Sequence, residues 1–364
     1  MNVTDVATQK LQARVKTLDA QVAALKEKLA GRQAEVDEEK VHLQAKYEVA
    51  NRQLKSLVKR EHKVAEYVAE VKQAVKALDP VSRVNFIRPK KSKTPITALF
   101  HATDWHVGHR VSKAETEGWG GFDWEIAQDR VLGQALPRFK AWLDTQRSGY
   151  VINDICLLGT GDWVSGDIHP ELRVTNEFPL PVQTARAGDL FSRLGLELSG
   201  LCENLRVEEV GGDNHGRLTP KGQMAQKAAN NMGYLVYHIA NAAWRKVSNI
   251  KVNQPESMKS LFTLGSTPFL AQHGDVVKSW AGIPWYGIER EMAREATNRM
   301  FGQGFKYLII GHFHKRFFGD IIVGGSLSGT DEYDRSCGRV SPPTQTAFLV
   351  GKRGPFNFVP FELR

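Results

Sequence analysis

The sequence has few cysteines, no long apolar run and no phosphate-binding loop of the Gly-x4-Gly-Lys-Ser/Thr kind. Its three cysteines, Cys156, Cys202 and Cys337, are too few and too scattered among 364 residues for a disulfide framework, which favours a reducing compartment. No eighteen consecutive residues are apolar, and the first ten include no apolar stretch like that of a signal peptide. We therefore expect a cytoplasmic protein with no membrane span, long enough for one large domain and an appendage.

The first eighty residues lack Trp and Phe and contain a single glycine, Gly31, and no proline before Pro80. They are rich in good helix formers, and apolar residues recur at positions 11, 15, 18, 22, 25 and 29, alternately four and three apart. This spacing predicts an all-α coiled-coil segment over residues 1–80 that joins copies of the chain into a homo-oligomer. After Gly31 the apolar stripe thins, so the helix either continues as a rod or folds back as a hairpin. A different protein partner and a solvated single helix remain alternatives.

The net charge of +9 comes almost entirely from residues 1–95. Residues 1–80 hold 15 Lys and Arg against 12 Asp and Glu, residues 81–95 hold five against none, and residues 96–364 hold 29 against 28. The Pro-flanked basic stretch at 81–95 is predicted to be a linker, which either contacts a polyanion or serves as a soluble tether. The predicted parts are thus a coiled coil (1–80), a basic linker (81–95) and a catalytic domain (96–364).

Five short polar clusters follow five apolar runs in the remainder of the chain. The runs, at residues 96–101, 152–158, 207–210, 269–272 and 307–310, predict strands, so the clusters are expected at one sheet edge. Five of the eleven histidines fall in these clusters, which favours metal binding over the commoner structural use of a lone histidine. The residues with metal-ligating atoms are Asp104, His106, Asp162, Asn214, His273, His312 and His314.

Imidazole nitrogens together with carboxylate and amide oxygens suit divalent Mn, Fe or Zn, and no thiolate is among these residues. If two ions lie about 3.5–4 Å apart, one carboxylate must bridge them, and such a pair can hold both the attacking and the leaving oxygen of a phosphoryl displacement. Asp162 is the natural bridge. The pattern predicts a dinuclear centre with two divalent ions, of which Mn is the first candidate.

The order Asp-x-His, Gly-Asp, Asn-His, His and Gly-His-x-His resembles the calcineurin-like metallophosphoesterase superfamily. Residues 102–110 (ATDWHVGHR) are most similar to its SbcD-like DNA-repair nuclease branch, and the resemblance covers residues 96 to about 350. It implies a layered α/β sandwich, a bridge at Asp162 and a general acid at His215. It also implies two ligand sets, which are Asp104, His106 and His314 for one ion and Asn214, His273 and His312 for the other.

The sequence departs from the family around the expected general acid. The family has Gly-Asn-His followed by an acidic residue, whereas here Asp213 precedes the pair and Gly216 follows it. Asp213 or a residue from elsewhere must therefore support a protonated His215. Arg217 and His109 are the expected substrate-binding residues, with Arg217 placed to meet a phosphate oxygen, although an arginine after a loop can equally be a surface charge.

Helices are expected over 124–142, capped by Asp123 and kinked or divided at Pro137, and over 182–205 and 221–247. Residues 321–329, 344–350 and 356–361 are expected to be closing antiparallel strands, and the loops 111–122 and 163–181 to shape the substrate cleft. The expected function is metal-dependent phosphodiester hydrolysis of DNA, with any ATPase partner on a separate chain. The alternatives are a phosphatase or nucleotide phosphodiesterase of the same superfamily, and a coiled-coil scaffold whose metal centre is idle.

Overall fold

The computed structural model describes residues 16–28, 40, 44, 46–48, 51–52, 55, 66–67, 69–73, 95–254, 256–278, 284–299, 302 and 304–364. The chain divides into two compact units, Met1–Val68 and Ala69–Arg364. The described residues of the first unit are helical, and Leu18, Val22 and Leu25 of the predicted seam are 49%, 48% and 65% exposed. Positions 11, 15 and 29 of the seam and residues 81–94 of the linker lie outside the described residues. The coiled coil and the domain boundaries therefore stay predictions.

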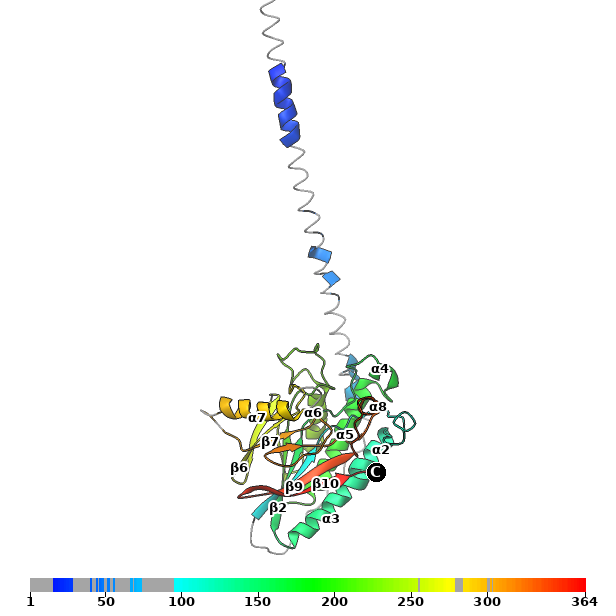
Figure 1. Ribbon diagram of the computed structural model, residues 1–364, viewed down its shortest axis with the longest axis vertical. Coiled ribbons are helices and arrows are strands. Elements are labelled where there is room, and N and C mark those ends of the chain that lie inside the picture. The colour runs from blue at the N-terminus through cyan, green and yellow to red at the C-terminus, as the bar shows by residue number, and fades with distance from the viewer. Residues whose placement is uncertain are drawn as a thin grey trace, which may run out of the picture. The chain divides into compact units, whose positions relative to one another are not determined.

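Two sheets form the centre of the second unit (Figure 1). The four strands β1 to β4 are parallel, and β9 and β10 continue their sheet antiparallel. The six-stranded sheet has the order β10 (Gly354–Glu362), β9 (Thr344–Gly351), β1 (Pro95–Ala102), β2 (Val151–Gly159), β3 (Asn204–Glu209), β4 (Ile250–Asn253). The four-stranded sheet has the order β5 (Lys259–Leu264), β6 (Thr267–Gln272), β7 (Tyr307–Ile310), β8 (Ile321–Val323).

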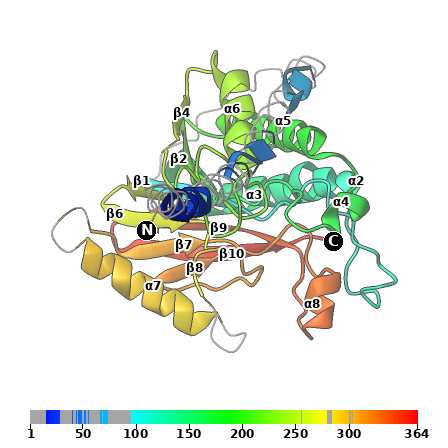
Figure 2. The same cartoon turned by 90° about the horizontal axis from the view of Figure 1, so that it is seen from above.

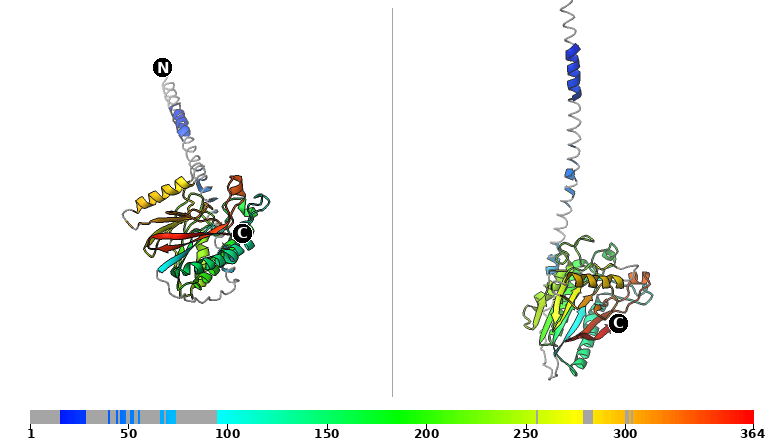
Figure 3. Two further views of the ribbon diagram at one scale, coloured as in Figure 1. Left: turned by 60° about the horizontal axis from the view of Figure 1, so that its bottom comes forward. Right: turned by 60° about the vertical axis from the view of Figure 1, so that its left-hand side comes forward.

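The sheets face each other across one apolar core. Leu99 of β1 and Phe348 of β9 meet Phe269 of β6 and Ile309 of β7 there, all fully buried. The outer face of the six-stranded sheet is covered by α3 (Leu136–Arg147), α5 (Leu180–Ser199) and α6 (Met232–Trp244), and that of the four-stranded sheet by α7 (Trp285–Asn298), as Figures 2 and 3 show. This is the layered α/β sandwich that the sequence predicts.

Local signals explain where several helices begin. The Asp123 carboxylate accepts a hydrogen bond from the Ile126 amide at 2.9 Å and caps α2 (Trp124–Gln128), as expected. The chain then continues through a π-helix, η1 (Asp129–Ala135), into α3. Pro137 lies in the first turn of α3, so the division between the π-helix and α3 falls just before it. The remaining short helices are α4 (Leu172–Thr175) and α8 (Glu332–Ser336).

Three sequence expectations about these elements are wrong. Residues 221–231 form turns rather than helix, and α6 begins only after Asn231, whose side chain caps it by accepting from the Gly233 amide at 2.7 Å. The predicted helix over 182–205 is α5, which ends at Ser199 because β3 already begins at Asn204. Of residues 321–329 only β8 is a strand, and it pairs parallel to β7 in the second sheet.

All three cysteines are free, with Cys156 and Cys202 buried and Cys337 exposed. None of the helices within the described ranges is long and apolar enough to cross a membrane.

Candidate metal centre

The polar clusters follow β1, β2, β3, β6 and β7, so they come from both sheets and not from one sheet edge as expected. The stacked sheets direct these strand ends toward one place, where backbone bonds join the loops: the Asp104 amide donates to the Gly161 carbonyl at 3.0 Å and the Gly311 amide to the His273 carbonyl at 2.9 Å. Eight described non-glycine residues have positive φ, and five of these are predicted ligands: Asp104, His106, Asp162, His312 and His314, with φ of 47–67°. Such strained backbone is characteristic of functional sites.

The first group comprises Asp104, His106 and His314, whose ligand atoms all lie within 4.8 Å of one another. Asp104 Oδ1 is 3.5 Å from His314 Nε2 and 4.0 Å from His106 Nε2, and the two imidazole nitrogens are 3.1 Å apart. The other oxygen of Asp104 accepts from the Thr103 hydroxyl at 2.6 Å. The ligands predicted for one ion thus meet in space.

The second group comprises Asp162, Asn214, His273 and His312. His273 Nε2 lies 3.0 Å from both Asp162 Oδ2 and Asn214 Oδ1, and the ligand atoms of Asp162, His273 and His312 lie within 4.8 Å of one another. Asp162 also joins a set with His106 and His215, so its carboxylate lies between the two groups. That position fits the bridge proposed for it.

Burial and charge act against each other in both groups. Burial disfavours the charge on Asp104, but its hydrogen bond to His314 and the charge of that imidazole lower the carboxyl pKa to about 2. Burial likewise opposes protonation of His314 and His273, yet Asp104 raises the pKa of His314 to about 9 and Asp162 raises that of His273 to about 10. Burial and the nearby His273 lower the pKa of His312 to about 4. Without an ion, a proton thus holds each carboxylate–imidazole pair together.

A backbone carbonyl supports His215. Its Nδ1 donates to the Ser165 carbonyl oxygen at 2.6 Å, its backbone amide donates to Asp162 Oδ1 at 3.0 Å, and its ring lies 4.5 Å from that of His106. Nε2 is then the nitrogen left to exchange a proton with a substrate. The loop carrying Ser165 packs so closely that a Cβ on Gly166 would lie 1.9 Å from the His215 carbonyl oxygen.

Asp213 does not replace the family's acidic partner. It is buried and turned inward, where Oδ2 accepts from the Asp162 amide at 2.8 Å and Oδ1 from the Gly216 amide at 2.7 Å. Burial and the neighbouring Asp162 raise the pKa of its carboxyl. Asp213 therefore holds the backbone of the second group. The partner of His215 is instead the Ser165 carbonyl, which the sequence could not indicate because any residue type supplies a carbonyl.

The two expected substrate-binding residues lie beside the groups. Arg217 is half-buried and its Nη1 donates to the Asn214 carbonyl at 3.1 Å. His109 is half-buried with its ring 6.4 Å from that of His106, and burial lowers its pKa although Asp331, before α8, acts in the opposite direction.

Two buried residues that sequence reasoning missed hold the backbone around Asp104. The Gln345 amide oxygen accepts from the Thr103 amide and from the Trp105 indole, both at 3.1 Å, and its nitrogen donates to the Thr103 carbonyl at 3.0 Å. The Arg130 guanidinium donates to the carbonyls of Leu327 and Ser328 at 2.8 and 3.0 Å, and the Leu327 amide in turn donates to the Asp104 carbonyl at 2.9 Å.

The donor set fits two divalent ions. Four imidazoles, two carboxylates and an amide oxygen converge, which suits Mn, Fe or Zn. Close packing is achieved by glycine: a Cβ on Gly311 would lie 2.2 Å from Thr103 Oγ1 and 2.5 Å from Asp104 Oδ2. The first group would hold one ion, the second group the other, and Asp162 both.

No protein-family description and no curated protein matches the sequence. Among solved structures, the chain is similar to wild-type Vps29 of Entamoeba histolytica complexed with zinc (12% identity, TM-score 0.27, covering 72% of this chain and 99% of that chain). It is also similar to the sulfate thiohydrolase SoxB of Thermus thermophilus (10% identity, TM-score 0.32, covering 75% of this chain and 57% of that chain). A predicted phosphoesterase of Streptococcus pneumoniae is similar as well (14% identity, TM-score 0.24, covering 44% of this chain and 74% of that chain).

Proposed function

We propose that the chain is a metal-dependent phosphodiester hydrolase of the calcineurin-like metallophosphoesterase type. The observation that carries this proposal is the meeting of Asp104, Asp162 and four histidines from segments up to 210 positions apart, within two groups whose ligand atoms lie inside 4.8 Å. A scaffold needs no such convergence of buried charge, which costs several kcal/mol per unpaired ion.

Two bound divalent ions would supply a hydroxide nucleophile at neutral pH and neutralise charge that develops on the phosphoryl oxygens. Water provides the new oxygen on phosphorus, the bond from phosphorus to the leaving oxygen breaks, and the diester becomes a monoester and an alcohol. The proton that the leaving oxygen needs comes from Nε2 of a protonated His215, while the Ser165 carbonyl fixes the ring through Nδ1. The Asp162 carboxylate orients the same residue by accepting from its backbone amide.

DNA is the proposed substrate, on the similarity of residues 102–110 to SbcD-like nucleases. The 96–364 segment holds 29 Lys and Arg against 28 Asp and Glu, so DNA binding would depend on local cations and on the basic residues at 81–95.

The direct test incubates the purified protein with single- and double-stranded DNA, a nitrophenyl phosphodiester and a phosphopeptide, with Mn and with chelator. We expect Mn-dependent cleavage of DNA and of the diester, and none with chelator. Faster hydrolysis of the phosphopeptide would make the chain a phosphatase, and no hydrolysis of any substrate with two ions bound would make it a scaffold.

We also propose that residues 1–80 join copies of the chain, because Leu18, Val22 and Leu25 leave an apolar stripe exposed on the described helix. Deletion of residues 1–68, the first unit, should lower the mass measured by light scattering to that of a monomer and leave hydrolysis of the small diester unchanged. An unchanged mass would contradict self-association through this segment.

A further inference from the structure

An aromatic surface adjoins the ligand loop that follows β7. This loop carries His312 and His314, and the ring of Phe313 between them lies 5.1 Å from that of His312. Phe313 packs on the outer side of the four-stranded sheet, against the same apolar cluster as Trp285 of α7. The Trp285 ring in turn lies 4.7 Å from that of Phe317. Aromatic side chains thus extend from a predicted ligand to the first turn of α7.

Backbone pairing shows how far Phe317 lies from the metal centre. Its amide donates to the Val323 carbonyl at 3.1 Å, and its carbonyl accepts from the Val323 amide at 2.9 Å. Val323 in β8 pairs with Ile310, the last residue of β7 before the ligand loop. Two strand spacings of about 4.8 Å therefore put the Phe317 backbone about 10 Å from the end of β7.

The first turn of α7 lies at the same sheet edge. A Cβ on Gly287 would lie 2.1 Å from the carbonyl oxygen of Lys278, so this turn packs on the loop that follows His273. Trp285 is half-buried there, whereas 44% of Phe317 is exposed. Phe317 thus offers ring surface to a ligand, and Trp285 supports it from behind.

Lysines flank this aromatic pair. Lys315 precedes Phe317 by two positions, and Lys278 lies on the loop that packs against α7. Both lysines are exposed, and neither forms an ion pair with a carboxylate of the described residues. Arg316 is instead paired with Glu362 at 2.6 Å. A phosphate near Phe317 would therefore meet lysine charge that no carboxylate offsets.

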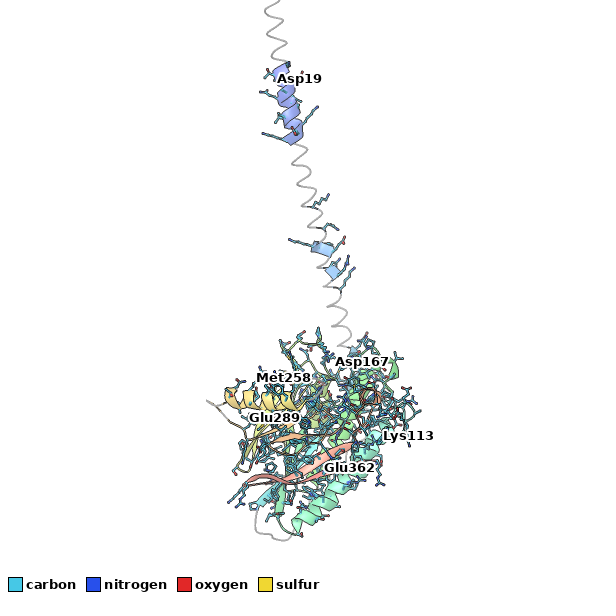
Figure 4. The ribbon with its side chains drawn as sticks, in the orientation of Figure 1. Asp19, Lys113, Asp167, Met258, Glu289 and Glu362 are labelled. Carbon is cyan, nitrogen blue, oxygen red and sulfur yellow. The ribbon has the colours of Figure 1, made fainter. Side chains whose placement is uncertain are left out.

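Two acidic groups lie on the neighbouring segments. Asp275, on the loop after β6, pairs with Lys227. Glu289, labelled on α7 in Figure 4, is exposed three positions after Tyr286, so the two share the outward face of the helix. The Arg290 guanidinium already lies 5.8 Å from the Tyr286 ring. Tyr286 is therefore not part of the aromatic surface, although it too is exposed.

We propose that Phe317, supported by Trp285 and flanked by Lys315, stacks on a base of single-stranded DNA whose scissile phosphate lies at the metal centre. The inference rests on the proposed function, because it names the substrate of that site. Ring surface beside cations is the combination that binds single strands, since every base has a π-face and every linkage a phosphate. A phosphopeptide, by contrast, need carry no ring near its phosphate. The base belongs to a nucleotide close to the scissile one, because Phe317 lies only about 10 Å from the end of β7.

The binding test is made in chelator, so that the strand stays intact. Fluorescence anisotropy compares a short oligothymidylate with an abasic strand of the same length. Wild-type protein should bind the oligothymidylate about tenfold more tightly, as one stacked base would produce. Phe317→Leu, which stays apolar against Trp285 but has no ring, should remove most of this preference, and Phe317→Tyr should keep it. Lys315→Ala should weaken both strands alike and reduce the salt dependence of binding.

Trp119→Leu is the matched control, because Trp119 is an aromatic residue that is 59% exposed on the loop 111–122. It should leave the preference for bases unchanged. Equal affinity of the wild-type protein for the two strands would overturn the proposal. So would a preference that Trp119→Leu removes and Phe317→Leu keeps, since the bases would then stack on the other loop.

Hydrolysis with Mn separates a substrate contact from support of the ligand loop. Phe317→Leu should raise KM for single-stranded DNA about tenfold and leave kcat nearly unchanged, because the ring contacts no reacting atom. An equal fall in kcat for DNA and for the nitrophenyl diester would make Phe317 a support of the loop and overturn the proposal. Dependence on Phe317 for a phosphopeptide but not for DNA would replace the base with a peptide side chain. If the wild-type protein does not hydrolyse the nitrophenyl diester, the proposed function is wrong, while the preference measured in chelator still decides whether Phe317 binds bases.

Discussion

In both ligand groups an aspartate has a positive φ, but the side chains that hold the neighbouring backbone differ. In each, an aspartate after a parallel strand adopts positive φ, 54° at Asp104 and 51° at Asp162, and a buried side chain fixes the neighbouring backbone. For Asp104 that side chain is the neutral amide of Gln345, and for Asp162 it is the ionisable carboxyl of Asp213. The support of the first group is therefore indifferent to pH, whereas the support of the second depends on the charge of Asp213.

The largest difference between the groups should come from replacing their aspartates. Asp162→Asn should remove both ions, because this carboxylate lies between the groups, and should abolish hydrolysis by roughly 10³-fold or more. Asp104→Asn should remove one ion. Metal content after dialysis, with circular dichroism to check folding, measures both. Two ions retained by Asp162→Asn with near-normal turnover would remove Asp162 from the bridge.

His215 lies between the groups, and its replacement tests whether hydrolysis needs a general acid. His215→Ala should keep both ions and slow DNA cleavage by about 10²–10⁴-fold. The loss should be much smaller for the nitrophenyl diester, since nitrophenolate leaves without a proton. Loss of an ion, or equal slowing of the two substrates, would make His215 a ligand or a positioning group, as its approach to His106 and Asp162 also permits.

Variants of the supporting residues should weaken the binding of one ion more than that of the other. Gln345→Glu turns a donating nitrogen into an oxygen facing the Thr103 and Thr344 carbonyls, so it should weaken the ion of the first group by about 10–100-fold. Asp213→Asn should weaken the ion of the second group to a similar extent. A two-site metal titration measures each affinity. If both variants weaken both ions alike, the groups form one cooperative unit.

The smallest expected effect is the proton released on metal binding. Because His314 and His273 have pKa values of about 9 and 10 in the metal-free protein, each is protonated at pH 7 and must lose its proton to bind an ion. Affinity should thus rise with pH up to about 9 for the ion of the first group and up to about 10 for that of the second, by about tenfold per unit for each ion that displaces one proton. Calorimetry in two buffers of different ionisation enthalpy should give about one proton per ion, and zero would refute the pairing.

The elements that place the site were accessible from sequence because each ligand follows a short, largely apolar run. The runs at 152–158 and 307–310 became β2 and β7 since buried strands combine hydrophobicity with punctuation by glycine or polar residues. The positions of Asp162, His312 and the other ligands could therefore be predicted from the strands that precede them.

Several of the missed features have no comparable signal. The β4 residues are largely exposed, so this strand shows no apolar pattern, whereas α7 presents an apolar face of Trp285, Ile288 and Met292 that the sequence does contain. The π-helix differs from an α-helix in hydrogen bonding rather than in residue type. Gln345 lies 241 positions from Asp104, and the support of His215 is a main-chain carbonyl, so tertiary structure alone brings them to the site.

The positive φ at five predicted ligands bears on whether such a site can persist without a use. A side chain in this backbone region costs on the order of 1 kcal/mol relative to glycine, so together the five forgo about 5 kcal/mol of a typical folding stability of about 5–15 kcal/mol. A chain that had abandoned its ions could recover this stability one glycine substitution at a time. Asp104, His106, Asp162, His312 and His314 therefore lower the stability of the metal-free protein, a cost that is expected where the geometry of a site, and not stability, sets the backbone conformation.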